Sequence, residues 1–253
     1  MTGEHPLVMR GISVRYGAVE AVRDISGHVG RGEVVGLIGP NGAGKTSLID
    51  ALSGFCRASG EVELCGRNVS NLSAHERARL GLGRTFQGAE LFRDLTVEEN
   101  LLVGVERAPW WSPVRDMLGR RRRDHDEAVA RALGAVGVGR QQAAAYPGEL
   151  SQGARKLVAV ARALAASPEV ILLDEPAAGL DSHESVEFGE RLKRVRDDGV
   201  GILLVDHDVE LIFGVCERIY VMNFGSLIES GPAAAVRADP GVIDAYLGVV
   251  TSG

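Results

Sequence analysis

One short segment has the residue types and the spacing to hold a phosphate group. Residues Gly39–Thr46, GPNGAGKT, fit the pattern G-x-x-x-x-G-K-[ST], with an apolar run before them and helical spacing after them. The glycines let the backbone wrap closely around a phosphate, and N–H groups at the helix start present partial positive charge to it. Lys45 can reach the β- and γ-phosphates of a nucleotide, and the Thr46 hydroxyl can bind Mg²⁺. A chance glycine turn is the alternative, and it explains neither the spacing nor the two flanks. The expected phosphate contacts come from the loop and the residue after it: Gly39, Pro40, Asn41, Gly42, Ala43, Gly44, Lys45, Thr46 and Ser47.

Two adjacent carboxylates follow a second apolar run. Residues 170–175 read VILLDE, which places Asp174 at the carboxyl end of a buried strand, where ligands bind in open α/β sheets. We expect Asp174 to hold Mg²⁺ and Glu175 to polarise the attacking water, because phosphoryl transfer needs both parts. A solvated strand end is the alternative for this pair when it is taken alone.

Three further side chains are candidates that local pattern leaves open. His207 ends the apolar run GILLVDHD and could contact the γ-phosphate, although a single histidine after a strand is more often structural. Gln87, in GRTFQ, could sense Mg²⁺ or water without adding charge. Tyr16, before a glycine, could stack on a base or pack in the core.

The surrounding pattern predicts an α/β fold that positions these residues. The first third is rich in short alternating strands, and after residue 150 buried strands alternate with helices, which favours a mostly parallel sheet. Between them, residues 88–150 are mostly helical, and Thr96 followed by Glu99 is typical of a capped helix start. We therefore predict a single domain over 1–253, with a core of 1–87 and 151–253 and an inserted helical subdomain at 88–150.

Composition excludes some classes of function. The chain has 253 residues, 45% of them hydrophobic and 25% charged, with a formal net charge of −6. This acidic balance disfavours nonspecific binding to nucleic acid. No signal peptide is apparent, and no apolar run approaches the roughly 18–20 residues that span a bilayer.

Taken together, these residues resemble one family over nearly the whole chain, the ATP-binding subunits of ABC transporters. Seven elements stand in the family's order: an adenine-stacking aromatic (Tyr16), the Walker A loop (Gly39–Thr46), the Q-loop (Gln87), the signature region LSQGARK with Ser151 and Gly153, the Walker B strand (Asp174, Glu175), the D-loop ending at Asp181, and the H-loop (His207). The segments GLGRTFQGAELFRDLTVEENLLVG, DEPAAGLD and DPGVIDAYLG resemble the branched-chain amino acid importer group, whose close relatives serve urea and short amides.

The resemblance implies the P-loop NTPase fold of an ABC nucleotide-binding domain, with an antiparallel β subdomain, and a working assembly. Two ATPase subunits would form a head-to-tail dimer holding two ATP with Mg²⁺, each between the Walker A loop of one subunit and the signature helix of the other. Glu175 would be the general base, His207 would hold the γ-phosphate, Gln87 would contact the metal, and Asp181 would link the two sites. The implied partners are transmembrane permease subunits, a second ATPase subunit (identical, or a related one, which the resemblance favours) and, indirectly, a periplasmic or surface solute-binding protein. The chain would then work at the cytoplasmic face of the membrane.

Two other classes of function fit the sequence less well. A soluble ABC-type ATPase acting on nucleic acid or ribosomes usually carries paired cassettes, coiled coils or basic arms, and the sequence has none of these. A P-loop kinase or GTPase would leave LSQGARK and His207 without a role, and the guanine-reading NKxD motif is absent.

Some features carry no firm assignment. The signature departs from the usual LSGGQ, with Gln152 in place of a glycine and Ala154 in place of a glutamine. The arginine run Arg120–Arg123 is interpreted as a solvated face, with a lipid or partner contact as the alternative. Trp110 and Trp111 could pack within the helical insert or touch a membrane partner.

Overall fold

The computed structural model describes residues 4–85, 91–105 and 120–242 of the chain. Over these ranges it contains a six-stranded sheet and a four-stranded sheet. The six-stranded sheet has the order β10-β9-β3-β8-β7-β6, in which β10 alone runs antiparallel to its neighbour among the described pairs. Its strands are β3 (Val34–Ile38), β6 (Leu82–Arg84), β7 (Val170–Asp174), β8 (Gly201–Val205), β9 (Arg218–Asn223) and β10 (Ser226–Pro232).

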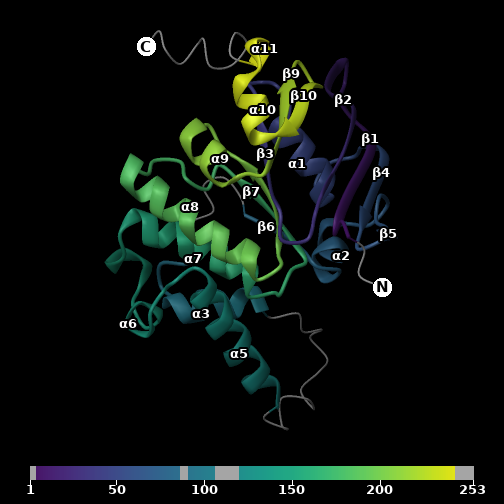
Figure 1. Cartoon of the computed structure of the whole chain (residues 1–253). Coiled ribbons are helices and arrows are strands. Elements are labelled where there is room, and N and C mark those ends of the chain that lie inside the picture. Colours follow the sequence, from purple (N-terminus) through teal and green to yellow (C-terminus); the bar gives the residue numbers. More distant parts are fainter. Residues whose placement is uncertain (1–3, 86–90, 106–119, 243–253) are drawn as a thin grey trace.

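The second sheet is antiparallel and has the order β2-β1-β4-β5. Its strands are β1 (Leu7–Tyr16), β2 (Val19–Val29), β4 (Ser59–Leu64) and β5 (Arg67–Asn68). This sheet covers one side of the central sheet together with α1 (Lys45–Ser53), while α7 (Gln152–Leu164), α8 (Ser182–Asp197) and α9 (Val209–Val215) cover the other (Figure 1).

The burial of the central strands explains their continuous apolar sequences. Every residue of β3, β7 and β8 is buried, because both faces of the sheet are covered. Alternate side chains of one strand enter opposite cores: Ile171 and Leu173 face the core with α7 and α8, whereas Val170 and Leu172 face the core with α1 and the antiparallel sheet. Two hydrophobic cores therefore fix the strand ends that carry the predicted site.

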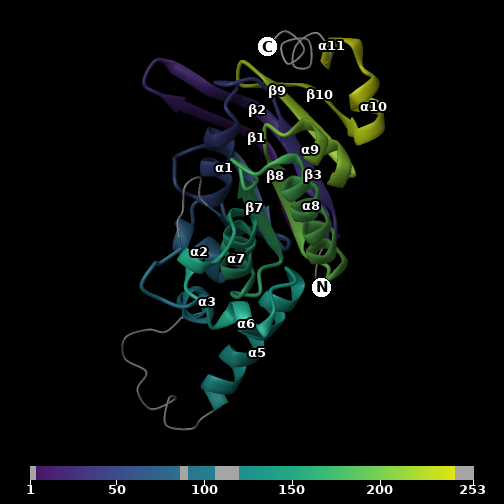
Figure 2. The same ribbon diagram turned by 90° about the vertical axis from the view of Figure 1, so that its left-hand side faces the viewer.

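Helices dominate the described part of the segment between β6 and α7. They are α3 (Val97–Val105), α5 (Arg120–Ala135), α6 (Arg140–Ala143) and a 3₁₀ turn at Pro147–Glu149, and they lie at the end of the molecule away from α10 and α11 (Figure 2). The predicted capped start of α3 is confirmed, since Thr96 Oγ1 accepts from Glu99 N at 3.2 Å and Glu99 Oε2 accepts from Thr96 N at 2.8 Å. The division of the chain into a core and an inserted subdomain at 88–150 stays a prediction.

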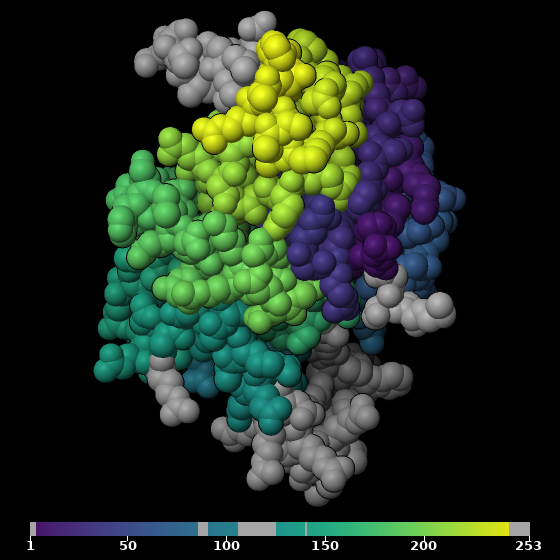
Figure 3. Space-filling view, viewed as in Figure 1, coloured from purple at the N-terminus to yellow at the C-terminus, as the bar shows by residue number. Residues whose placement is uncertain are grey.

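Segments far apart in the sequence meet at the edge of the two sheets. The C-terminal part contains α10 (Ala233–Ala238) and α11 (Pro240–Val242), and β10 packs beside β2 (Figure 3). β9 and β10 form an antiparallel hairpin in which Asn223 pairs with Ser226. Within the described residues, no helix is both long and apolar enough to cross a bilayer.

Several local features add to what the sequence analysis predicts. The helix α1 ends at Ser53 because Gly54 adopts a left-handed conformation (φ 79°), and the Phe55 side chain is exposed. The arginine run Arg120–Arg123 forms the first described turn of α5, and its interpretation as a solvated face stays a prediction. Three helices were not predicted: α2 (Ala74–Arg79), α9 and α10. Trp110, Trp111 and most of the C-terminal segment DPGVIDAYLG lie outside the described residues.

Candidate functional site

The phosphate-binding loop connects β3 to α1, as its sequence predicts. Lys45, at the first position of α1, is buried, and its Nζ donates to the carbonyl oxygens of Gly39 at 2.7 Å and Pro40 at 3.1 Å. Burial lowers the pKa of Lys45, which the nearby carboxylates of Glu175 and Asp174 oppose. The Lys45 ammonium is thus fixed against the loop backbone and close enough to Glu175 and Asp174 to interact electrostatically with both.

Two of the loop glycines are required by close approach as well as by conformation. A Cβ at Gly39 would lie 2.2 Å from the carbonyl oxygen of Met222, and a Cβ at Gly44 would lie 2.2 Å from that of Ala21. The loop is also tied to the β9–β10 turn, since Gly225 N donates to Ala43 O at 3.0 Å. The phosphate loop therefore packs against β2 and against the β9–β10 hairpin. These contacts join segments that are far apart in the sequence, so no local pattern predicts them.

Glu175 and His207 form a pair at the carboxyl ends of two neighbouring strands. Asp174 of β7 pairs with Val205 of β8, so the residues that follow both strands emerge at one sheet edge. His207 Nε2 lies 2.9 Å from Glu175 Oε1, with the histidine half exposed and the glutamate largely buried. The pair therefore brings a carboxylate and an imidazole, two groups that can exchange protons with a substrate, to one edge of the sheet.

Asp206 is a supporting residue that the sequence analysis missed. Its buried carboxylate accepts hydrogen bonds from Ala177 N at 3.0 Å and Asp208 N at 3.0 Å. Burial raises the pKa of Asp206, and the backbone hydrogen bonds counteract part of that effect. The carboxylate joins the segments that follow β7 and β8, and its place immediately before His207 was the available signal.

The carboxylate of Asp174 fits a divalent cation. It is almost fully buried, and among the described residues no hydrogen-bond partner reaches its Oδ1. Burial raises the pKa of Asp174, while Arg84 and Lys45 lower it. A buried carboxylate oxygen without a donor, near a helix that begins with Lys45 and Thr46, matches the oxygen ligands that Mg²⁺ prefers.

Tyr16 lies at the end of β1, beside the start of α1. Its hydroxyl interacts with the side chains of Ser47 and Cys56, and burial raises its pKa. The side chain is 49% exposed, so a large part of the ring remains accessible to a base. Core packing, the alternative for this aromatic, does not describe a half-exposed position.

The signature residues form a second group, at the starts of α7 and α8. Ser151 caps α7 by accepting from Ala154 N at 3.2 Å, and Asp181 caps α8 by accepting from Glu184 N at 2.8 Å. Gly153 N donates to Glu184 Oε1 at 3.4 Å, a long hydrogen bond from the N-terminus of α7. The signature and D-loop segments are thus packed on each other within one chain.

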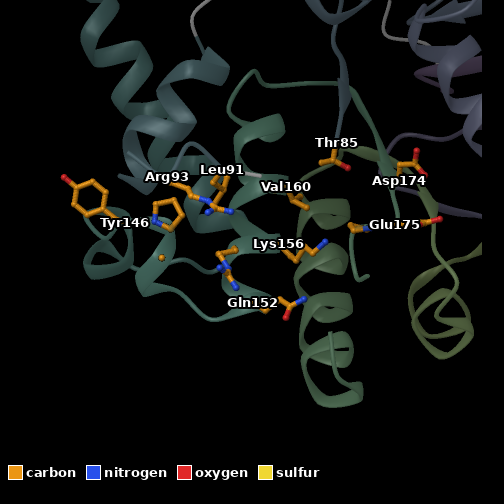
Figure 4. A pocket seen from close by; sticks show the side chains of 14 residues that line it. Thr85, Leu91, Arg93, Tyr146, Gln152, Lys156, Val160, Asp174 and Glu175 are labelled. Atoms are coloured by element: carbon orange, nitrogen blue, oxygen red, sulfur yellow. The ribbon is translucent and has the colours of Figure 1, made fainter. Parts of the chain in front are cut away.

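A groove of about 650 Å³ is lined by residues adjacent to both groups (Figure 4). Gln152 and Lys156 of α7 line one wall, and Asp174 and Glu175 line another. Thr85 also lines the groove, two residues before Gln87, which itself lies outside the described residues. Arg93 and Tyr146, from the helical segment, complete the rim and were not predicted.

Comparisons with known proteins agree with this geometry. The family model for "ABC transporter" matches residues 22–178, and that for "Branched-chain amino acid ATP-binding cassette transporter" matches residues 226–250. The chain is 37% identical over 249 residues to the high-affinity branched-chain amino acid transport ATP-binding protein LivG of Salmonella typhimurium, covering 96% of this chain and 97% of that protein. It is 39% identical over 228 residues to the lipopolysaccharide export system ATP-binding protein LptB of Acidithiobacillus ferridurans, covering 90% of each.

Solved structures share the fold over the same length. The ADP conformation of an ATP-binding cassette of an ABC transporter superposes with a TM-score of 0.84 at 28% identity, covering 97% of this chain and 100% of the other. A dimeric bacterial ABC transporter cassette superposes with a TM-score of 0.70 at 25% identity, covering 90% and 98%. The phosphate loop, the acidic strand end and these matches together establish that the chain belongs to the ABC transporter family, as an ATP-binding ATPase subunit of its branched-chain amino acid transport group.

Proposed function

We propose that this subunit hydrolyses MgATP at the interface of a head-to-tail dimer and so drives an importer of branched-chain amino acids or a related small solute such as urea or a short amide. The observation that carries the proposal is the Glu175–His207 pair at 2.9 Å, next to a buried carboxylate oxygen of Asp174 that has no hydrogen-bond partner in the described part of the chain. Glu175 orients and deprotonates the attacking water, and His207 holds the γ-phosphate and the water in line.

Mg²⁺ is assigned to Thr46 and Asp174, with Gln87 as a further ligand. When bound, the ion would neutralise charge that develops on the phosphate oxygens. The residues of the chain do the remaining work: the N–H groups of the Gly39–Thr46 loop and the start of α1 bind the phosphates, Ser47 follows that loop, and Tyr16 stacks on the base.

The signature group supports a split site. Ser151 and Gly153 lie at the N-terminus of a 13-residue helix, where backbone N–H groups favour an anion. In the dimer that anion is the γ-phosphate held by the partner subunit, and Asp181 links the two sites. A cassette of this family that has been solved as a dimer makes such an assembly available to the fold.

The remaining partners follow from the transport role. Permease subunits supply the membrane path and hold the ATPase at the cytoplasmic face of the membrane, and a solute-binding protein delivers the substrate.

The match at residues 226–250 and the similarity to LivG favour branched-chain amino acids as the transported solutes. The similarity to LptB makes lipopolysaccharide export the second candidate. The net charge of −6 opposes a nucleic-acid partner.

Purification from the native membrane tests the assembly and the direction of transport. A tagged copy should retain integral-membrane subunits, and proteoliposomes containing the complex and its solute-binding protein should accumulate leucine, urea or acetamide only with ATP. Glu175→Gln in the same complex is the control for hydrolysis. Copurification with a lipopolysaccharide export permease, or ATP turnover that none of the three solutes stimulates, would contradict the importer assignment.

A further inference from the structure

Arg84, at the end of β6, is a buried cation that joins two of the elements in the metal site. Its guanidinium lies 2.7 Å from Asp50 Oδ1 and donates to Ser53 Oγ at 2.7 Å, both on α1, and its second terminal nitrogen lies 3.8 Å from Asp174 Oδ2 on β7. The Arg84 side chain is 8% exposed, and its guanidinium also lies over the Phe55 ring, 5.2 Å from the centroid.

The two oxygens of Asp174 have different surroundings. Oδ2 faces Arg84, whereas Oδ1 is buried without a hydrogen-bond partner among the described residues. At 3.8 Å the contact is an ion pair, in which the planar guanidinium attracts Oδ2 and so biases the rotation of the carboxylate. Oδ1 would then be the oxygen available to a metal ion. Groups that orient a metal ligand in this way are part of the site although they do not touch the ion.

The other end of the bridge reaches the helix that carries Thr46. Asp50 stands four residues after Thr46, so the two lie on one face of α1. The guanidinium therefore stands between the two described segments that bear proposed Mg²⁺ ligands, α1 with Thr46 and β7 with Asp174.

We infer that Arg84 is a positioning residue for the Mg²⁺ site, fixing the Asp174 carboxylate relative to α1. The inference rests on the proposed function, in that Mg²⁺ is assigned to Thr46 and Asp174. A cation beside a metal site also repels the ion, but Asp50 neutralises most of that charge. The two effects of Arg84 therefore predict opposite results when it is removed. Loss of its positive charge alone would strengthen Mg²⁺ binding, whereas loss of its orienting contact with Asp174 would weaken Mg²⁺ binding.

The experiment separates these two effects with a charge-balanced double variant. Arg84→Met/Asp50→Asn removes one positive and one negative charge, so the net charge of the site is unchanged and the orienting contact is lost. Binding of N-methylanthraniloyl ATP is measured by fluorescence in EDTA and then across an Mg²⁺ titration.

The double variant should need about 10-fold more Mg²⁺ to reach half of the Mg²⁺-dependent change in nucleotide fluorescence. This is the low end of the effect of losing an outer-shell partner. Its affinity in EDTA should change less than about twofold, since the phosphate loop is untouched, and Arg84→Lys should lie between the double variant and the native protein because it restores charge without the planar fork.

Arg77→Met is the matched control. Arg77 is also a buried arginine against α1, but it donates to the carbonyl oxygens of Ala51 and Leu52 rather than to a carboxylate of the metal site. It should lower the melting temperature and leave the Mg²⁺ requirement at the native value.

A native Mg²⁺ requirement in the double variant would overturn the inference and leave Arg84 as a charge partner of Asp50 alone. An equal loss of affinity in EDTA and in Mg²⁺ would overturn it as well. If the double variant does not fold, Arg84→Lys decides: a Mg²⁺ requirement raised twofold or more supports the positioning role, and a native requirement contradicts it. Absence of any Mg²⁺ dependence in the native protein would refute the metal assignment itself, an outcome distinct from failure of the Arg84 variants.

Discussion

At the scale of single residues, Glu175 adopts a backbone conformation that few residues other than glycine adopt. Its φ is 49°, and its N–H donates to Val205 O at 2.8 Å, which turns the chain sharply after β7. This turn directs the carboxylate to His207 rather than along the strand. Strain of this kind persists where surrounding structure enforces it, and here the bond to β8 and the Asp206 carboxylate do so.

Glu175→Gln should retain ATP binding and lose turnover. The amide keeps the size and one hydrogen-bonding oxygen of the carboxylate but cannot accept a proton from water, a loss that typically lowers a rate by about 10²–10⁴-fold. Steady-state phosphate release and fluorescent nucleotide binding measure the two properties. Glu169→Gln is the control, because this carboxylate pairs with Arg31 just before β7 begins. Hydrolysis at the native rate in Glu175→Gln would remove Glu175 from the mechanism.

At the scale of elements, the phosphate loop depends on strands that are remote in the sequence. Gly42 and Gly44 both have positive φ, 80° and 100°. A Cβ at Gly42 meets nothing within 4 Å, whereas one at Gly44 approaches Ala21 O to 2.2 Å. A substitution at Gly42 therefore measures the cost of the left-handed conformation alone, and one at Gly44 measures that cost together with the cost of the clash with β2.

Gly44→Ala should destabilise the fold more than Gly42→Ala. The left-handed conformation costs each alanine about 1–2 kcal/mol. The clash with β2 should add about 1–3 kcal/mol for Gly44→Ala alone, the usual cost of overpacking. Urea denaturation of both variants measures the difference in the free energy of unfolding. Equal losses would mean that β2 yields to the extra methyl group and does not support the loop rigidly.

At the scale of the whole molecule, the proposed split site begins with an intramolecular contact at the signature helix. Gly153 N donates to the Glu184 carboxylate at 3.4 Å, so an acidic group of the same chain lies where the partner's γ-phosphate is proposed to bind. Glu184 also belongs to the cap of α8 that includes Asp181. When the partner's γ-phosphate binds, it would replace the Glu184 carboxylate as the acceptor for Gly153 N, and Glu184 would move toward the D-loop.

Opposite charge changes at this contact should have opposite effects on the dimer. In the Glu175→Gln background, Glu184→Gln removes a negative charge beside the phosphate position. It should lower the ATP concentration for half-maximal dimerisation about two- to fivefold, corresponding to about 0.3–1 kcal/mol at a helix N-terminus. Gly153→Asp adds a negative charge there and should abolish the dimer while sparing ATP binding to the monomer. Analytical ultracentrifugation across an ATP series measures both.

Glu99→Gln controls for the loss of a helix cap, since Glu99 has the same capping role on α3. It should leave the ATP dependence of dimerisation unchanged. An ATP-bound dimer that persists in Gly153→Asp, or a weaker dimer in Glu184→Gln, would contradict the split-site arrangement.

The non-consensus signature residues have a structural account at this scale. Gln152, where the family commonly has glycine, places its amide against Gly179, 2.6 Å from the position of a Cβ there. Ala154, where glutamine is common, supplies the N–H that Ser151 caps. Both substitutions leave the N–H of Gly153 in place.

Local pattern predicted the buried central strands, the phosphate loop and the acidic strand end, whereas the roles of Tyr16, Gln87, His207 and the signature residues came from the family resemblance and stay predictions. Apolar runs predicted β3, β7 and β8, because strands buried on both faces must be apolar throughout. The Gly39–Thr46 spacing and the acids after β7 identified the nucleotide chemistry, because a loop glycine, a cap and a strand end depend on residues near each other in the chain. The end of α1 at Ser53 is set by a single residue, Gly54, whose left-handed conformation stops the helix.

Contacts between distant segments were decided only by the tertiary structure. The order of the strands places β6 beside β7, and this alone brings Arg84 to Asp174 and Asp50. The pairing of β7 with β8 sets the 2.9 Å contact between Glu175 and His207, and the packing of β10 beside β2 supports the phosphate loop. Sequence by itself determined which chemical groups are present and the local form of the phosphate loop and of the buried strands. Their mutual distances depend on burial of two separate cores, a property of the whole chain that no segment encodes alone.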